Sequence, residues 1–92
     1  MKVLVEVYGL LRELMGWKSV EVEISDDLTL EQLIDILVSE KPKAKELILE
    51  GSRLRDYVKV LVNGRDCRFL SELKTKLEDG YVISIFPPAG GG

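Results

Sequence analysis

Alternating apolar and polar positions mark the strands of this chain. Near the N-terminus the segment 3–7 places a valine at every second position, which is the period typical of a half-buried strand. The same spacing returns in the segments 20–24, 58–62 and 81–86. Most of the repeating positions hold β-branched residues, which favour extended backbone. The pattern predicts four strands, and the first two lie close enough in the sequence to pair as a hairpin.

The apolar residues of the segment 30–38 follow a helical spacing instead. They fall at positions i, i+3, i+4, i+7 and i+8, which places them in one stripe along a helix. Thr29 can cap this helix, and Gln32 stands at the position that completes a capping box. Pro42 restricts the residue before it, so the helix is expected to end before this proline. A second, short helix is predicted over residues 43–50.

The order of the elements indicates the fold. It runs strand, strand, helix, strand, a very short strand at 65–69, and a final strand. A single layer cannot bury its own apolar side, so the main helix must cover one face of the sheet. We therefore expect an α+β domain of the ubiquitin-like β-grasp type over residues 1–86, with a mixed sheet of four or five strands and one main helix on one face. Residues 87–92 are expected to form a flexible tail rich in proline and glycine.

Composition and charge exclude several kinds of chemistry. Histidine is absent from the 92 residues and Cys67 is the single cysteine, which excludes a histidine-containing triad, a zinc cluster of the usual ligands and an intramolecular disulfide. The net charge is -3 without a basic block, which gives little support to nucleic-acid binding. No apolar run approaches the roughly 20 residues of a membrane span. We expect a cytoplasmic protein that is not an enzyme by itself, with no metal, bound cofactor, nucleic acid or membrane partner.

The second face of the predicted sheet carries apolar residues that a small monomer does not need there. If the valines and isoleucines of the strands face the helix, the opposite face presents Leu4, Leu61, Val82 and Phe86. Grouped apolar residues at a surface usually mark a site of protein contact. Loops that cover some of them, or scattered surface residues without a role, are the alternative. These four residues are the candidate docking face.

The chain finishes on an unusual segment. Pro87 and Pro88 stop the final strand, because proline donates no backbone hydrogen bond. The positions after them carry almost no side chain: Ala89, Gly90, Gly91 and Gly92. Six residues at about 3.3 Å each reach roughly 20 Å beyond Phe86, far enough to enter another protein. The reactive group of this tail is the α-carboxylate of Gly92, which needs activation, for example as an acyl-adenylate; a frayed, inert terminus is the alternative.

The chain resembles the MoaD/ThiS-type β-grasp sulfur carriers, and most closely the small subunit of molybdopterin synthase. The resemblance covers nearly the full length. It rests on four segments, Arg12-Glu13-Leu14, Val62-Asn63-Gly64, Leu77-Glu78-Asp79-Gly80 and Ile85-Phe86-Pro87-Pro88-Ala89-Gly90-Gly91.

The resemblance implies a reaction at the C-terminus, in molybdenum cofactor biosynthesis. In the family, a ubiquitin-activating-enzyme-like adenylyltransferase of the MoeB type uses ATP to adenylate the terminal glycine, which is then converted to a thiocarboxylate. The thiocarboxylate enters the large (MoaE-type) subunit of molybdopterin synthase and gives its sulfur to the dithiolene of molybdopterin. By resemblance, Gly92 is the activated residue, or Gly91 if the chain is trimmed, because relatives usually end on two glycines. The residues that would thread into the partner are Pro87, Pro88, Ala89, Gly90 and Gly91.

Other functions begin from the same features. A ubiquitin-like modifier would join its activated terminus to lysines of target proteins, and a carrier for tRNA thiolation or thiamine would use the same thiocarboxylate. A non-catalytic β-grasp binding module with an inert tail is a further alternative.

Cys67 has Arg65 and Arg68 nearby in the sequence, which could lower its pKa. In the family the C-terminal glycine carries the sulfur, so Cys67 is expected to be a structural or surface thiol.

Overall fold

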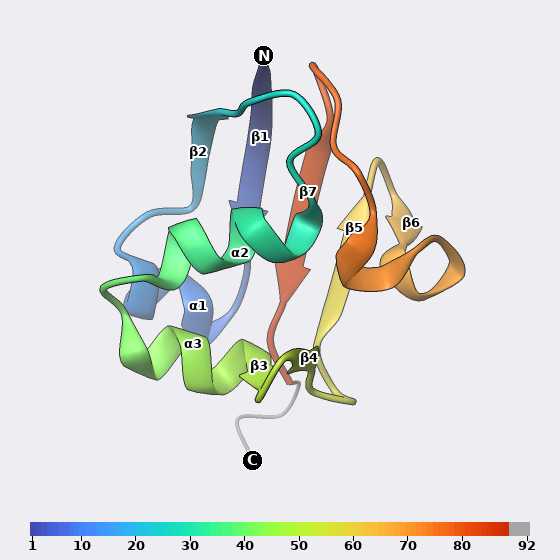
Figure 1. Cartoon of the computed structure of the whole chain (residues 1–92). Coiled ribbons are helices and arrows are strands. Elements are labelled where there is room, and N and C mark those ends of the chain that lie inside the picture. The colour runs from blue at the N-terminus through green and yellow to red at the C-terminus, as the bar shows by residue number, and fades with distance from the viewer. Residues whose placement is uncertain (89–92) are drawn as a thin grey trace.

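The computed structural model describes residues 1–88 of the chain. A mixed sheet of five strands forms the centre of the molecule, in the order β2-β1-β7-β5-β6 (Figure 1). The strands are β1 (Lys2–Val7), β2 (Ser19–Glu23), β5 (Lys59–Val62), β6 (Arg65–Asp66) and β7 (Val82–Phe86). The first and last strands lie side by side and run parallel, whereas the other pairs are antiparallel. This arrangement is the predicted β-grasp order, with the predicted hairpin of β1 and β2.

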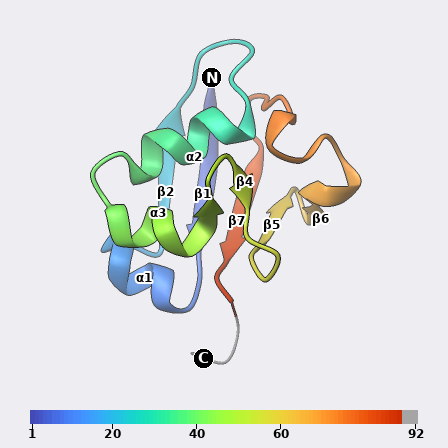
Figure 2. The same ribbon diagram turned by 60° about the horizontal axis from the view of Figure 1, so that its bottom comes forward.

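Three α-helices, a small hairpin and two short 3-10 helices complete the described chain. They are α1 (Leu10–Met15), α2 (Leu30–Val38), α3 (Pro42–Ile48), β3 (Leu49–Glu50), β4 (Arg53–Leu54), η1 (Cys67–Phe69) and η2 (Glu72–Lys74). Helix α2 lies across the sheet in front of β1 and β7, and α1 and α3 lie together near the end of the molecule where the chain leaves β7 (Figure 1 and Figure 2). No helix among residues 1–88 combines the length and hydropathy that crossing a bilayer requires.

The capping box predicted for α2 is present. The Thr29 hydroxyl accepts a hydrogen bond from the backbone N–H of Gln32 at 3.3 Å, and the Gln32 side chain accepts one from the N–H of Thr29 at 2.9 Å. These two bonds satisfy donors that a helix start otherwise leaves free. The stripe behind them is buried, with Leu33 and Ile34 fully enclosed. The predicted main helix over 30–38 is confirmed.

The covered face of the sheet is the core of the domain. Alternate strand residues point toward α2 and are at most 3% exposed: Val3, Val5, Val7, Val60, Val62, Ile83 and Ile85. Burying one such side chain contributes about 1.5–3 kcal/mol relative to leaving it in water. The period of two in the sequence therefore predicted correctly which residues of β1, β5 and β7 are buried, whereas Val20 and Val22 of the edge strand β2 are only partly buried.

Two predicted segments differ from the structure. The second helix, predicted over 43–50, is α3 and ends at Ile48, because Leu49 turns into extended backbone and buries its side chain in β3, opposite Leu54 of β4. The strand predicted over 65–69 keeps only Arg65 and Asp66. The Asp66 carboxylate accepts a hydrogen bond from the N–H of Arg68 at 2.9 Å, which caps η1 and ends the strand.

Candidate functional site

The C-terminal tail leaves the domain from the centre of the sheet. Strand β7 pairs with β1 as far as Ile85 and with β5 as far as Phe86, and Pro87 and Pro88 follow it, both partly buried. The end of β7 lies beside the connection between β1 and α1 (Figure 2). The predictions for Ala89, Gly90, Gly91 and Gly92 fall outside the described residues. The structure thus defines the base of the tail, and the role of the terminal carboxylate stays a prediction.

Pro87 is held against the connection between β1 and α1. A Cβ placed on Gly9 would lie 3.0 Å from Cγ of Pro87, closer than side chains normally approach. The φ of Gly9 is +56°, a value that residues with a side chain rarely adopt. Glycine at this position therefore serves both the turn into α1 and the passage of the tail. The first residue of the tail lies against the domain.

Three side chains meet at the base of the tail. The rings of Tyr8 and Phe86 are stacked, with centroids 4.4 Å apart and an interplanar angle of 5°. The guanidinium carbon of Arg12 lies 4.9 Å from the centroid of the Tyr8 ring, and Nε of Arg12 donates a hydrogen bond to the carbonyl of Val7 at 2.9 Å. Arg12, Tyr8 and Phe86 are called the tail-base cluster below.

The four residues predicted for docking share the open face of the sheet, and all are partly buried. Leu4 and Val82 are direct neighbours on β1 and β7. The next row holds Glu6, Ser84 and Leu61, and the hydroxyl of Ser84 donates a hydrogen bond to the Glu6 carboxylate at 3.3 Å.

The expectation of one grouped apolar patch is therefore wrong in its detail. The polar pair Glu6 and Ser84 lies between the Leu4–Val82 pair and the tail-base cluster, whereas Leu61 in the same row is apolar. The structure confirms that the four residues lie on one uncovered face, and their contact with a partner stays a prediction.

A shallow groove of about 340 Å³ continues from the tail base along the open face. It is lined by Tyr57, Lys59, Leu61, Phe86 and Pro87. Tyr57 is 82% exposed. Tyr8, Tyr57 and Lys59 were not predicted from the sequence as residues of this site. The signal for Tyr8 was present, because it continues the alternation of Leu4 and Glu6 along the open face, whereas Tyr57 stands just before a strand, where the pattern carries no information.

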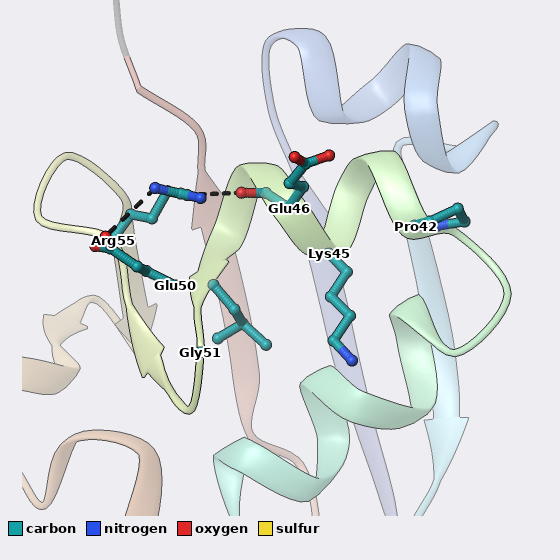
Figure 3. A pocket seen from close by; sticks show the side chains of 7 residues that line it. Pro42, Lys45, Glu46, Glu50, Gly51 and Arg55 are labelled. Atoms are coloured by element: carbon teal, nitrogen blue, oxygen red, sulfur yellow. Dashed lines mark hydrogen bonds and ion pairs between the residues drawn. The ribbon is translucent and has the colours of Figure 1, made fainter.

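A second hollow, of about 430 Å³, lies between α3 and the small hairpin (Figure 3). Arg55 spans its rim: Nε donates to the carbonyl of Glu46 at 2.6 Å, and a terminal nitrogen lies 4.0 Å from the Glu50 carboxylate. The side chains of Lys45 and Glu46 point in opposite directions (Figure 3). The guanidinium thus joins α3 to the hairpin, and this hollow offers no group with an evident chemical role.

Cys67 is fully buried in the core. Burial, followed by the charge of Asp66, raises the pKa of its thiol from 9.0 to about 11, and the opposing charge of Arg68 does not outweigh them. The guanidinium of Arg68 donates to the backbone carbonyls of Val58 and Arg55, at 2.8 and 2.9 Å. The thiol is therefore protonated at neutral pH, and the prediction of a structural cysteine is confirmed. Within residues 1–88 no group of acidic or cysteine side chains is placed to hold a metal ion.

Comparison with known proteins identifies the family. The chain matches the ThiS family over residues 5–92. It is 33% identical to small archaeal modifier protein 3 of Haloferax volcanii, over 92% of each chain. Among solved structures it is similar to a chain of the Amycolatopsis orientalis BexX/CysO complex, with a TM-score of 0.81, 31% identity, and coverage of 98% of this chain and 99% of the other. It is also similar to a putative molybdopterin converting factor, subunit 1, from Pyrococcus furiosus, with a TM-score of 0.78, 29% identity, and coverage of 97% and 99%.

These findings confirm the ubiquitin-like β-grasp fold and the resemblance to MoaD/ThiS-type proteins. They place the chain among small sulfur carriers and ubiquitin-like modifiers. Small sulfur carriers of this type are not catalytic themselves. The chain belongs to the ThiS family.

Proposed function

We propose that this protein is a sulfur carrier that acts as the small subunit of molybdopterin synthase. The observation that carries the proposal is the place of the tail, which continues directly from the central strand β7 and starts beside an open, partly apolar sheet face. A large subunit that binds this face would receive the tail at a fixed position. Similarity to the Pyrococcus furiosus protein supports the same role.

The proposed chemistry takes place at the carboxylate of Gly92. An oxygen of this carboxylate attacks the α-phosphorus of ATP on the MoeB-type partner, and pyrophosphate leaves. Sulfur at the oxidation level of sulfide then attacks the carbonyl carbon, and AMP leaves, which gives the thiocarboxylate. In the MoaE-type subunit the sulfur passes to the pterin precursor, and water returns the terminus to a carboxylate. Our chain supplies the sulfur, and the partners supply the catalytic groups.

The length of the tail is critical in this proposal. One residue moves the terminal carbon by about 3.3 Å. A misplacement of about 1 Å can cost about 10²-fold in rate. The full chain and a chain that ends at Gly91 are therefore expected to differ strongly in sulfur transfer, and the more active of the two identifies the working terminus.

The direct test is the intact mass of the protein after incubation with the adenylating enzyme, ATP and a sulfur donor. The expected mass increase equals the replacement of one oxygen by one sulfur, and it should be absent from a control without ATP. Addition of the large subunit and the pterin precursor should then yield molybdopterin and restore the original mass. A chain that gains sulfur but yields no molybdopterin would contradict the synthase role and leave a carrier for tRNA thiolation or thiamine.

A second candidate function is protein modification. It is favoured by the 33% identity to small archaeal modifier protein 3. In this function the ε-amine of a lysine attacks the activated carbonyl carbon and forms an isopeptide bond. Purification of the tagged protein from cells under denaturing conditions, followed by a search for lysines that carry its C-terminal residues, tests it. No such lysine in cells that express the activating enzyme would contradict this function.

A further inference from the structure

We propose that Arg12 and Tyr8 are positioning residues that fix the direction in which the tail enters the activating enzyme. The proposal rests on the proposed activation of the terminus. Arg12 and Tyr8 act through Phe86, the last residue of β7 and the one that directly precedes the tail.

The ring of Phe86 stacks on the ring of Tyr8. The Phe86 ring lies parallel to the Tyr8 ring, with centroids 4.4 Å apart and 5° between the planes. Tyr8 is itself fixed by its backbone, since its N–H donates to the carbonyl of Ile85 at 3.1 Å. The tyrosine hydroxyl lies 3.4 Å from the Glu6 carboxylate and can donate to it. The ring of Phe86 is thus supported from the neighbouring strand, whereas an unsupported aromatic at a strand end would sample several rotamers.

The charge of Arg12 lies beside the Tyr8 ring. Its guanidinium carbon lies 4.9 Å from the centroid of the Tyr8 ring, within the range of a cation–π contact. Nε of the same side chain donates to the carbonyl of Val7, which anchors the guanidinium at the end of β1. Among residues 1–88 Arg12 takes part in no ion pair. The guanidinium is therefore held by Val7 in a position where it contacts the ring of Tyr8.

Phe86 connects the stacked pair to the tail. A residue before proline is restricted in its backbone, and proline itself has a nearly fixed φ. Both restrictions apply to consecutive residues here, since Phe86 precedes Pro87 and Pro87 precedes Pro88. Pro87 also lies against the connection between β1 and α1, which is possible because Gly9 has no side chain: a Cβ there would lie 3.0 Å from Cγ of Pro87. A fixed Phe86 therefore sets the direction of the chain as far as Pro88, before the glycines begin.

This arrangement predicts a specific kinetic signature. A tail that starts in the right direction needs less ordering when it enters a narrow site. Loss of the cluster should lower the kcat of adenylation by about 3- to 10-fold, with little change in KM. This factor corresponds to the energy of one stacked aromatic contact. A residue that only contributes to docking would instead raise KM and leave kcat unchanged.

The experiment compares Arg12→Gln and Tyr8→Ala with the wild-type chain. Initial rates of pyrophosphate release are measured with the adenylating enzyme and ATP, while the concentration of the chain is varied. Tyr8→Phe keeps the ring and is expected to retain most of the kcat that Tyr8→Ala loses. Arg53→Gln is the matched control, because Arg53 on β4 is exposed and, within residues 1–88, its one ion pair is with the exposed Asp56. A second readout is the nuclear Overhauser contact between the rings at positions 8 and 86, which should weaken in Arg12→Gln.

The outcomes separate this proposal from the proposed function. No pyrophosphate release with the wild-type chain would overturn the proposed function and, with it, this inference. If the wild-type chain is activated and the Arg12→Gln and Tyr8→Ala variants keep the wild-type kcat, this inference alone is overturned. A rise in KM at unchanged kcat would also overturn it, because it would assign the cluster to docking. A melting temperature near that of the wild type in each variant shows that the rates compare folded proteins.

Discussion

The two faces of the same sheet differ in what their residues contact. On the covered face the residues of β1, β5 and β7 are at most 3% exposed and lie against α2 and the rest of the core. On the open face the residues are partly buried or exposed, and the hydrogen-bonded pair of Glu6 and Ser84 lies among its apolar residues. The first face stabilises the domain, and the second is free to meet a partner beside the tail. Substitutions on the covered face should therefore change stability, and those on the open face should change function.

The largest loss of stability is expected from Leu33→Ala on α2. Leu33 is fully buried, and its truncation removes apolar contacts and leaves a cavity. The free energy of unfolding, measured by urea denaturation, should fall by about 2–5 kcal/mol. Ile36→Ala is the control on the same helix, because Ile36 is 54% exposed, and it should cost less than about 1 kcal/mol. Similar losses for the two variants would contradict the division into covered and exposed faces.

Gly9→Ala tests whether the tail base depends on the turn that faces it. Alanine at φ +56° is strained and meets Pro87, so a loss of about 1–3 kcal/mol is expected by urea denaturation. Gly16→Ala isolates the strain, because Gly16 has φ +85° and no heavy atom within 4 Å of its Cβ position. Only the first variant should also slow thiocarboxylate formation. If both variants slow thiocarboxylate formation equally, the contact between position 9 and Pro87 has no part in that reaction.

Cys67 in η1 gives the stability of the core a dependence on pH. Burial raises the pKa of the folded thiol from 9.0 to about 11, so the folded state holds its proton at pH values where the unfolded state has lost it. The stabilising contribution is fully present below about pH 9 and declines as the pH rises toward 11. Unfolding free energies of wild type and Cys67→Ala, compared from pH 8 to 11, should diverge in slope only above pH 9. Parallel curves, or rapid alkylation of the folded thiol at pH 8, would show that the thiol is not protected by the core.

The smallest change in stability is expected from Leu61→Ser on the open face. Leu61 is only partly buried, so its replacement should alter the free energy of unfolding by less than about 1 kcal/mol. The affinity of the Leu61→Ser variant for the large synthase subunit should nevertheless fall about tenfold, as for a residue near the centre of an interface. Isothermal titration calorimetry measures this affinity. Unchanged affinity together with unchanged stability would leave the open face without a role in docking.

The covered face could be predicted from the sequence almost completely. The alternation of valine and isoleucine in β1, β5 and β7, and the capping box of Thr29 and Gln32, are local signals that agree with the tertiary structure. The small hairpin after α3 could not be predicted. Leu49 leaves the helix only because a buried position opposite Leu54 is available, and that position is created by the tertiary fold.

The tail base could be predicted only in part. The two prolines and the terminal glycines in the sequence predicted the tail, and the alternation of the last strand predicted that Phe86 lies on the open face. The contact between Arg12 and Tyr8 depends on how α1 packs back beside β1. The proximity of Gly9 to Pro87 depends on the parallel pairing of the first and last strands, which are far apart in the sequence.

The central claim is that the C-terminal carboxylate carries the sulfur. The most direct measurement is mass spectrometry of the tryptic peptide 77–92, after incubation of the chain with the adenylating enzyme, ATP and a sulfur donor. We predict that sulfur replaces oxygen at the terminal residue of this peptide, in the full chain but not in a chain that lacks residues 90–92. Sulfur found on Cys67, or no sulfur on either chain, would contradict it.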